Sequence, residues 1–202
     1  MIAFKFIIIA VISYLLGSLN FGVILSRGMK NEDVRESGSG NAGTTNMMRT
    51  YGKTLGLLTI AGDILKVIIA IWLAFRIVSV EELKMTLDSA SDYPQVVLKS
   101  LAGLFAVLGH IFPCYFKFKG GKGVATSGGM VIAIDWRIAL ILLAIFALTI
   151  LITKYVSLGS ILMAIFYPVF IGIVYKDIIL VLIALVFTVI IVVAHRENVT
   201  RL

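Results

Sequence analysis

Residues 38 to 49 form a segment of small and polar residues that could bind a phosphate group. Its glycines would let backbone amides approach an anion closely, and hydroxyl, amide and guanidinium groups follow at short intervals. The candidate ligands are Ser39, Asn41, Thr45, Asn46 and Arg49. The glycines also satisfy the G-x-G-x-x-G pattern of dinucleotide loops, but charged residues precede them where that motif needs a β-strand. The alternative is a flexible solvated loop, which would not need several Asn and Thr residues beside an arginine.

A second segment, residues 109 to 126, joins a histidine to a basic, glycine-rich run. Lys122 lies between glycines directly before an apolar stretch, and such a lysine at a helix start is typical of phosphate sites. The segment is not a Walker A loop, because Gly123 stands where that motif needs Ser or Thr. His110 is a catalytic candidate because ionisable groups inside membranes are often functional, although a structural hydrogen-bonding role is the alternative. Lys117 and Lys119 fit the positive bias of cytoplasmic loops.

Two further pairs of polar residues lie three positions apart, the spacing that puts side chains on one helix face. His195 and Asn198 follow the last apolar run and are candidate site residues, with an interfacial cap as the alternative. Asp63 and Lys66 lie inside an apolar run. We expect the opposite charges of Asp63 and Lys66 to neutralise each other, so this pair should have a structural role.

The composition places these segments in a membrane protein. Of the 202 residues 60% are hydrophobic and 14% charged, with a mean hydropathy of +1.05, whereas globular domains carry about 25% charged residues. This excludes a soluble enzyme, a secreted disulfide domain and a disordered chain. The single cysteine, Cys114, excludes an internal disulfide, and two histidines make a poor metal site. The net charge of +7 indicates an anionic membrane surface, not nucleic acid.

Seven apolar segments predict an all-α, polytopic membrane bundle in a single domain, residues 1–202. The segments are Phe6 to Leu25, Thr54 to Phe75, Ser100 to Phe116, Val124 to Ile134, Ile138 to Thr153, Tyr155 to Tyr175 and Ile178 to Ala194. The fourth is short for a crossing and could be re-entrant.

The basic residues predict the orientation of the bundle. If all seven segments cross, eleven Lys and Arg residues share the side of the C-terminus, six fall on the other side, and Lys66 lies within a span. Because cytoplasmic loops carry the excess, we expect the N-terminus outside and the C-terminus in the cytoplasm. All three polar segments then face the cytoplasm.

Together the segments resemble the bacterial acyl-phosphate:glycerol-3-phosphate acyltransferase family (PlsY). The resemblance is carried by Gly17-Ser18, by residues 38–49, by residues 109–125 and by residues 195–198, in that order. It implies seven helices, a cytoplasmic active site in the bacterial inner membrane, an acyl phosphate donor, glycerol 3-phosphate as acceptor and lysophosphatidic acid as product. It also implies a monomer without a cofactor. The implied site residues are Ser39, Asn41, Thr45, Asn46, Arg49, His110, Lys122, Ser160, His195 and Asn198.

The roles of these residues follow from the implied reaction. Lys122, Arg49 and Ser39 would hold the glycerol phosphate, and His195 and Asn198 would orient it or the donor. The general base is His110, His195 or a phosphate oxygen of the substrate, and Ser39 would also touch the reacting groups. A transporter of a phosphorylated or anionic solute is the rival function, because intramembrane charges and broken helices occur in transporters.

Overall fold

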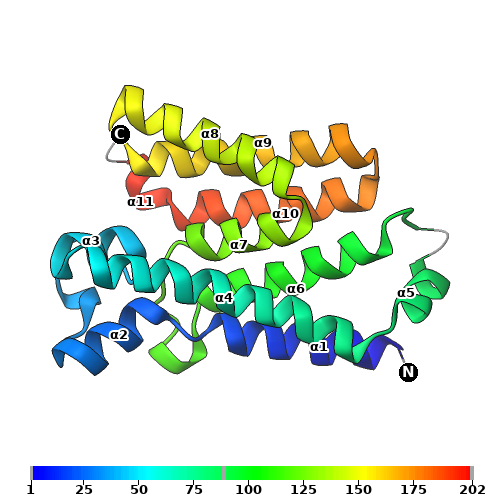
Figure 1. The fold of residues 1–202 in the computed structure, drawn as a ribbon, viewed down its shortest axis with the longest axis horizontal. Coiled ribbons are helices and arrows are strands. Elements are labelled where there is room, and N and C mark those ends of the chain that lie inside the picture. The colour runs from blue at the N-terminus through cyan, green and yellow to red at the C-terminus, as the bar shows by residue number, and fades with distance from the viewer. Residues whose placement is uncertain (1, 88–89, 201–202) are drawn as a thin grey trace.

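The computed structural model describes residues 2–87 and 90–200, and these form an all-helical bundle without β-strands (Figure 1). Arg201, which contributed to the charge count, lies outside the described residues. The long helices of the bundle are α1 (Ile2–Gly17), α4 (Lys53–Ile77), α6 (Pro94–Ile111), α8 (Trp136–Thr153), α9 (Val156–Tyr175) and α10 (Ile178–Ala194). The shorter elements are α2 (Phe21–Lys30), η1 (Val34–Glu36), α3 (Thr44–Tyr51), α5 (Val80–Leu87), η2 (Cys114–Phe116), α7 (Val124–Ile134) and α11 (Arg196–Val199).

The outer surface of the bundle is apolar, as lipid contact requires. Large side chains such as Phe4, Ile152 and Ile178 are 67%, 80% and 68% exposed, a pattern that water would penalise. Helices suit this environment because they satisfy their own backbone hydrogen bonds. Among the described residues, five helical stretches are long and apolar enough to span a membrane, namely Ile2–Lys30, Lys53–Ile77, Pro94–Phe116, Trp136–Thr153 and Val156–Tyr175.

All seven apolar segments of the sequence are helical, but α7 and α10 are shorter than the five candidate spans. The eleven residues of α7 extend about 16 Å, roughly half the hydrocarbon thickness of a bilayer. In Figure 1, α7 lies between α4 and α6 on one side and α8 on the other, and it contacts all three. A helix of this length is therefore buried within protein along much of its course.

The first apolar segment, Phe6–Leu25, lies within one candidate membrane span, Ile2–Lys30, but that span contains a break that the sequence did not predict. The helix stops at Gly17 and restarts at Phe21, with Asn20 as the N-cap whose side-chain oxygen accepts a hydrogen bond from the amide of Val23 at 3.4 Å. An asparagine that caps the next helix competes with helix continuation, although the surrounding run is apolar. The break leaves the carbonyl of Leu19 available to a side chain from another helix.

The polar stretch that follows the break is more ordered than its composition indicates. It contains the end of α2, the turn η1 and the helix α3. A further short helix, α5, lies in the connection between α4 and α6 at the opposite end of the bundle (Figure 1). Neither α3 nor α5 was expected, because both are short and polar.

Glycines in α1 and α6 let these two helices pack in close contact. A Cβ atom at Gly17 would overlap the Ala106 carbonyl oxygen, and one at Gly109 would overlap the Tyr14 carbonyl oxygen. Small residues of this kind let membrane helices approach closely. The α1–α2 break therefore lies directly against the end of α6, where the second polar segment begins.

Candidate active site

The first polar segment is organised around the side chain of Asn46. Its Nδ2 lies 2.9–3.0 Å from the carbonyl oxygens of Val34, Ser37 and Asn41, and its Oδ1 accepts from the amide of Ser39 at 2.8 Å. Asn46 is 2% exposed, so these bonds form away from water. One amide therefore holds the whole loop between η1 and α3 in one conformation.

Around this loop, the other candidates of the segment lie nearer to the surface. Asn41 accepts a bond from the Gly43 amide at 2.9 Å through Oδ1, which closes a tight turn before α3. Ser39, Thr45 and Arg49 are exposed. The segment thus combines a rigid loop with solvent-facing hydroxyl and guanidinium groups, the arrangement that an anion site needs.

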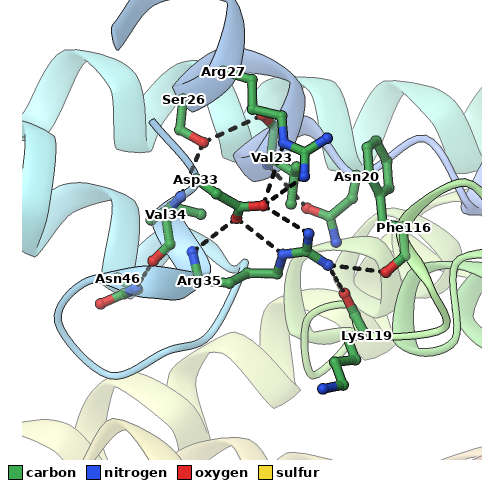
Figure 2. A network of polar contacts seen from close by, with 10 residues as sticks. All are labelled: Asn20, Val23, Ser26, Arg27, Asp33, Val34, Arg35, Asn46, Phe116 and Lys119. Carbon is green, nitrogen blue, oxygen red and sulfur yellow. Dashed lines mark hydrogen bonds and ion pairs between the residues drawn. The ribbon is translucent and has the colours of Figure 1, made fainter. Parts of the chain in front are cut away.

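An ion-pair network joins η1, directly before the first polar segment, to the second polar segment (Figure 2). Arg35 binds the Asp33 carboxylate through two nitrogens at 2.7 and 2.9 Å, and its Nη1 donates to the carbonyl oxygens of Phe116 at 2.9 Å and Lys119 at 2.8 Å. Arg27 reaches the same carboxylate at 2.9 Å. The hydrogen bond and charge of Arg35 hold the pKa of Asp33 well below its usual range, and Asp33 in turn raises the pKa of Arg35.

Asp33 and Arg35 were not among the site residues predicted from the sequence. Their spacing of two positions resembles an ordinary surface pair, and only the folded chain shows that Arg35 bonds a loop more than eighty positions away. A possible signal was the position of an arginine directly before the glycine-containing segment. Such an arginine can hold a loop as well as a ligand.

The second polar segment folds back onto the end of α6. The amides of Gly120 and Gly121 donate to the carbonyl oxygens of Ile111 and His110 at 3.2 and 3.1 Å. A Cβ atom at Gly121 would overlap Nε2 of His110, so only glycine permits this contact. Lys122 follows immediately and precedes Gly123, the N-cap of α7. The first-turn amides of α7 lack intrahelical partners and add partial positive charge next to this lysine.

His110 belongs to a buried cluster with Asp63 and Lys66. Lys66 Nζ lies 2.8 Å from Asp63 Oδ1, which confirms the expected ion pair. The same ammonium lies 2.8 Å from Nδ1 of His110 and 3.0 Å from the carbonyl oxygen of Leu19. The three side chains are at most 3% exposed. We expected Asp63 and Lys66 to interact only with each other. Lys66 in fact also contacts the α1–α2 break and His110.

The third polar segment places His195 at the end of α10. Nδ1 of His195 lies 2.8 Å from the Ile191 carbonyl oxygen, and burial lowers the pKa of His195 against the effect of that bond, with the charge of Lys122 lowering it further. This charge effect links the second and third segments. Asn198 lies in α11, half-buried, and Ser160 is buried in α9, where its hydroxyl donates to the Val156 carbonyl at 3.0 Å.

Several buried polar atoms within these segments have no hydrogen-bond partner among the described residues. They are Thr44 Oγ1, Thr50 Oγ1, Thr126 Oγ1, Ser127 Oγ and Asn198 Oδ1. Leaving a buried polar atom unpaired costs about 1–3 kcal/mol, so proteins retain such atoms mainly where a ligand or water completes them. All five belong to, or directly adjoin, the polar segments predicted from the sequence.

Other polar features are less suited to this chemistry. A shallow hollow of about 400 Å³ at the opposite end of the bundle contains Lys99, Asp135, Arg137 and Tyr175, but its charges are largely engaged within the protein. Arg137 pairs with Asp135 at 2.8 Å, and Lys99 donates to the Ala133 carbonyl at 2.7 Å. Within residues 2–87 and 90–200, no three His, Cys, Asp or Glu side chains lie close enough together to hold a metal ion.

The described residues define an all-helical membrane protein with several helices long enough to span a membrane and with polar segments at one end. The family model described as glycerol-3-phosphate acyltransferase matches residues 7–202, and the chain belongs to that family. Among curated relatives, glycerol-3-phosphate acyltransferase of Clostridioides difficile strain 630 is 42% identical over 165 residues, which cover 78% of this chain and 72% of that protein. The protein of the same name from Ureaplasma urealyticum serovar 10 is 45% identical over 150 residues, which cover 74% of this chain but only 59% of that protein.

Two solved structures share the fold. One is the glycerol 3-phosphate form of PlsY (YgiH), described as an integral membrane glycerol 3-phosphate acyltransferase, with a TM-score of 0.82 and 34% identity over 97% of this chain and 90% of that one. The other is its lysophosphatidic acid form, with a TM-score of 0.80 and 33% identity over the same shares. The resemblance inferred from the polar segments is therefore confirmed as family membership.

Proposed function

We propose that this protein transfers a fatty acyl group from an acyl phosphate to the 1-hydroxyl of glycerol 3-phosphate. The products are lysophosphatidic acid and inorganic phosphate, and the reaction would begin phospholipid synthesis. The observation that carries the proposal is that Lys122 directly precedes the N-cap of α7, whose first turn carries two buried hydroxyls without a described partner, Thr126 Oγ1 and Ser127 Oγ. Both substrates carry phosphate, and the family relatives are named for the same acceptor.

The groups that would bind phosphate are those that supply positive charge or hydrogen-bond donors. Lys122 and the first-turn amides of α7 would hold the phosphate of glycerol 3-phosphate, with Arg49 and Ser39 completing the charge and hydrogen bonding. Asn41 and Thr45 line the neighbouring loop and would contact the second phosphate. Asn46 acts through the loop that it holds, since its amide is engaged by the backbone at both ends.

His195 is the better placed of the two histidines to accept a proton. A carbonyl oxygen can only accept a hydrogen bond, so the contact with Ile191 requires a proton on Nδ1. Nε2 then carries the free lone pair. In the proposed step Nε2 takes the proton of the 1-hydroxyl, the hydroxyl oxygen attacks the acyl carbonyl carbon, and the bond between that carbon and the phosphate oxygen breaks. Inorganic phosphate leaves with the electron pair.

The remaining groups position the reactants. Asn198 lies in α11, which directly follows His195, and its Oδ1 has no hydrogen-bond partner among the described residues. Its side chain would orient the glycerol. Ser160 lies on α9 next to α10, where it would border the path of the acyl chain. An acyl phosphate is already activated, so orientation and electrostatic stabilisation can supply most of the acceleration. The outward apolar surface lets the acyl chain enter from lipid.

The proposed setting is the inner membrane of a bacterium. The N-terminus lies outside and the site faces the cytoplasm, where glycerol 3-phosphate is available, and the chain acts as a monomer without a cofactor. Cysteine labelling tests the orientation, with single cysteines introduced at exposed Lys117 and at exposed Lys84 in a Cys114→Ser background. Only the cysteine at position 117 should be protected from an impermeant reagent in intact cells.

The decisive assay uses purified protein in detergent with palmitoyl phosphate and glycerol 3-phosphate. Inorganic phosphate and lysophosphatidic acid should appear in equal amounts, and palmitoyl-coenzyme A should not replace the donor. The rival function is tested with protein in sealed vesicles. Uptake of labelled glycerol 3-phosphate without any acyl transfer would show a transporter and overturn the proposal.

A further inference from the structure

The cluster of Asp63, Lys66 and His110 is the feature that the proposed reaction leaves unexplained. Three ionisable groups from two helices are almost completely buried, and such groups are costly inside a membrane. Breaking a buried ion pair is strongly destabilising, yet replacing both charges by apolar groups often is not. Stability alone therefore does not account for the cluster.

Lys66 Nζ lies among three acceptors. An ammonium group has three hydrogens and accepts none. Asp63 Oδ1 and His110 Nδ1 each lie 2.8 Å from Nζ, and the Leu19 carbonyl oxygen lies 3.0 Å away. His110 Nδ1 also lies 3.4 Å from Asp63 Oδ1. Because the contact with Lys66 is the shorter one, we assign Nδ1 as an acceptor from the ammonium, which leaves the proton of the neutral ring on Nε2.

The protonated nitrogen faces the segment that carries Lys122. Nε2 of His110 lies against Gly121, and the Gly121 amide donates to the His110 carbonyl oxygen at 3.1 Å. Gly121 is therefore held by both the ring and the backbone carbonyl of His110. His110 cannot accept a second proton at Nδ1 without placing a cation beside the Lys66 ammonium.

We propose that Asp63, Lys66 and His110 form a positioning unit that holds His110 as a neutral, Nε2-protonated ring beneath Gly121 and thereby fixes Lys122, and that His110 is not a general base. Lys66 also binds the Leu19 carbonyl at the α1–α2 break, so the same ammonium aligns that break with the second polar segment. The unit acts through Lys122, and in this respect the inference rests on the proposed function.

The protonation of His110 can be measured without any substrate. The chain has only two histidines, so ¹⁵N NMR of histidine-labelled protein at pH 7 gives two rings, and His110→Gln assigns them. We expect His110 to be protonated at Nε2 and His195 at Nδ1. Removing both charges with the double variant Asp63→Asn, Lys66→Met should alter the His110 signals and leave those of His195 unchanged. A proton on Nδ1 of His110, or unaltered His110 signals in the double variant, would overturn the inference.

Kinetics of two substitutions separate positioning from base catalysis. Glutamine places an amide donor near the position of Nε2, whereas asparagine is too short to reach Gly121. His110→Gln should keep kcat within about tenfold while the KM for glycerol 3-phosphate rises, and His110→Asn should raise that KM further. A fall in kcat of about 10²–10⁴-fold at unchanged KM in both variants is the result of losing a base and contradicts the inference. If the wild-type protein transfers no acyl group, the proposed function fails, while the NMR experiment still decides the protonation of His110.

Discussion

Nδ1 of His195 lies 2.8 Å from the carbonyl oxygen of Ile191, one helical turn earlier in the chain. This contact places the proton on Nδ1 and directs the lone pair of Nε2 away from the helix. In the arrangement that we propose, His110 is the opposite case, because its Nδ1 lies 2.8 Å from the Lys66 ammonium and accepts from it. The two histidines of the chain are therefore not interchangeable, although their sequence surroundings made them equal candidates for the same task.

The lowered pKa of His195 predicts how the reaction depends on pH. Burial, and after it the Lys122 charge, disfavours the protonated ring, so the base stays neutral to lower pH than an ordinary histidine. The acid limb of the kcat profile should lie below pH ~6.5, and kcat should fall as pH decreases through it. Initial rates at saturating substrates between pH 4.5 and 8 check this. A limb above pH 7 contradicts the assignment.

Lys122 should dominate the affinity for glycerol 3-phosphate. Lys122→Ala removes a charged donor worth about 1.5–3 kcal/mol, so the KM for glycerol 3-phosphate should rise roughly 10- to 150-fold. Lys117→Ala is the matched control, since Lys117 is an exposed lysine of the same segment. Steady-state kinetics of both variants decide the matter, and equal effects would exclude a specific role for Lys122.

Arg35 and Arg27 bind the same carboxylate, but we expect Arg35 to contribute more to stability and to substrate affinity. The Arg35 side chain is 18% exposed and also bonds two carbonyls of the second segment, whereas that of Arg27 is 56% exposed. Arg35→Ala should lower stability by about 1–3 kcal/mol and raise the KM for glycerol 3-phosphate, and Arg27→Ala should cost at most about 1 kcal/mol. Thermal unfolding in detergent together with kinetics tests this. Similar midpoints for the two variants would contradict the bridging role of Arg35.

Asn46 should be needed for the structure of its loop. Asn46→Asp replaces an amide donor by a carboxylate that faces three carbonyl oxygens, so the unfolding free energy should fall by about 1–3 kcal/mol or more. Asn41→Asp is the comparison, because its contact with the Gly43 amide needs only an acceptor oxygen. The thermal midpoint should drop clearly only in the first variant. A larger loss in Asn41→Asp would show that Asn46 does not hold the loop.

Gly121 should tolerate no side chain. In Gly121→Ala the new Cβ would overlap the His110 ring, so the segment must shift and acyl transfer should fall at least tenfold. Gly128→Ala lies in the following helix with open space around the added atom, and it should leave the rate near that of the wild type. Parallel assays of the purified variants compare the two. Full activity in Gly121→Ala would refute the close packing as a functional requirement.

The sequence was sufficient to predict the seven apolar helical segments and the family. Long uncharged runs can only be helical in lipid, and phosphate chemistry restricts the residue types around Lys122. The break at Ser18–Asn20 was missed because the apolar run continues through it, and a capping side chain outweighs hydropathy there.

Contacts between distant segments were outside what composition and spacing could predict. The bond from Arg35 to Lys119 and the contact of Lys66 with His110 join residues that are 84 and 44 positions apart. Each depends on how the helices cross, and the crossing depends on small residues whose neighbours a single sequence does not specify. The network in Figure 2 therefore became apparent only with the fold.

The central claim is tested most directly by following two labels through one reaction. Purified protein receives acyl phosphate labelled with ³²P and glycerol 3-phosphate labelled with ¹⁴C in its glycerol carbons. We predict that ³²P appears only in inorganic phosphate and ¹⁴C in lysophosphatidic acid, in a ratio of one to one. Failure to form labelled lipid, or the appearance of ³²P within the lipid, would contradict acyl transfer from an acyl phosphate.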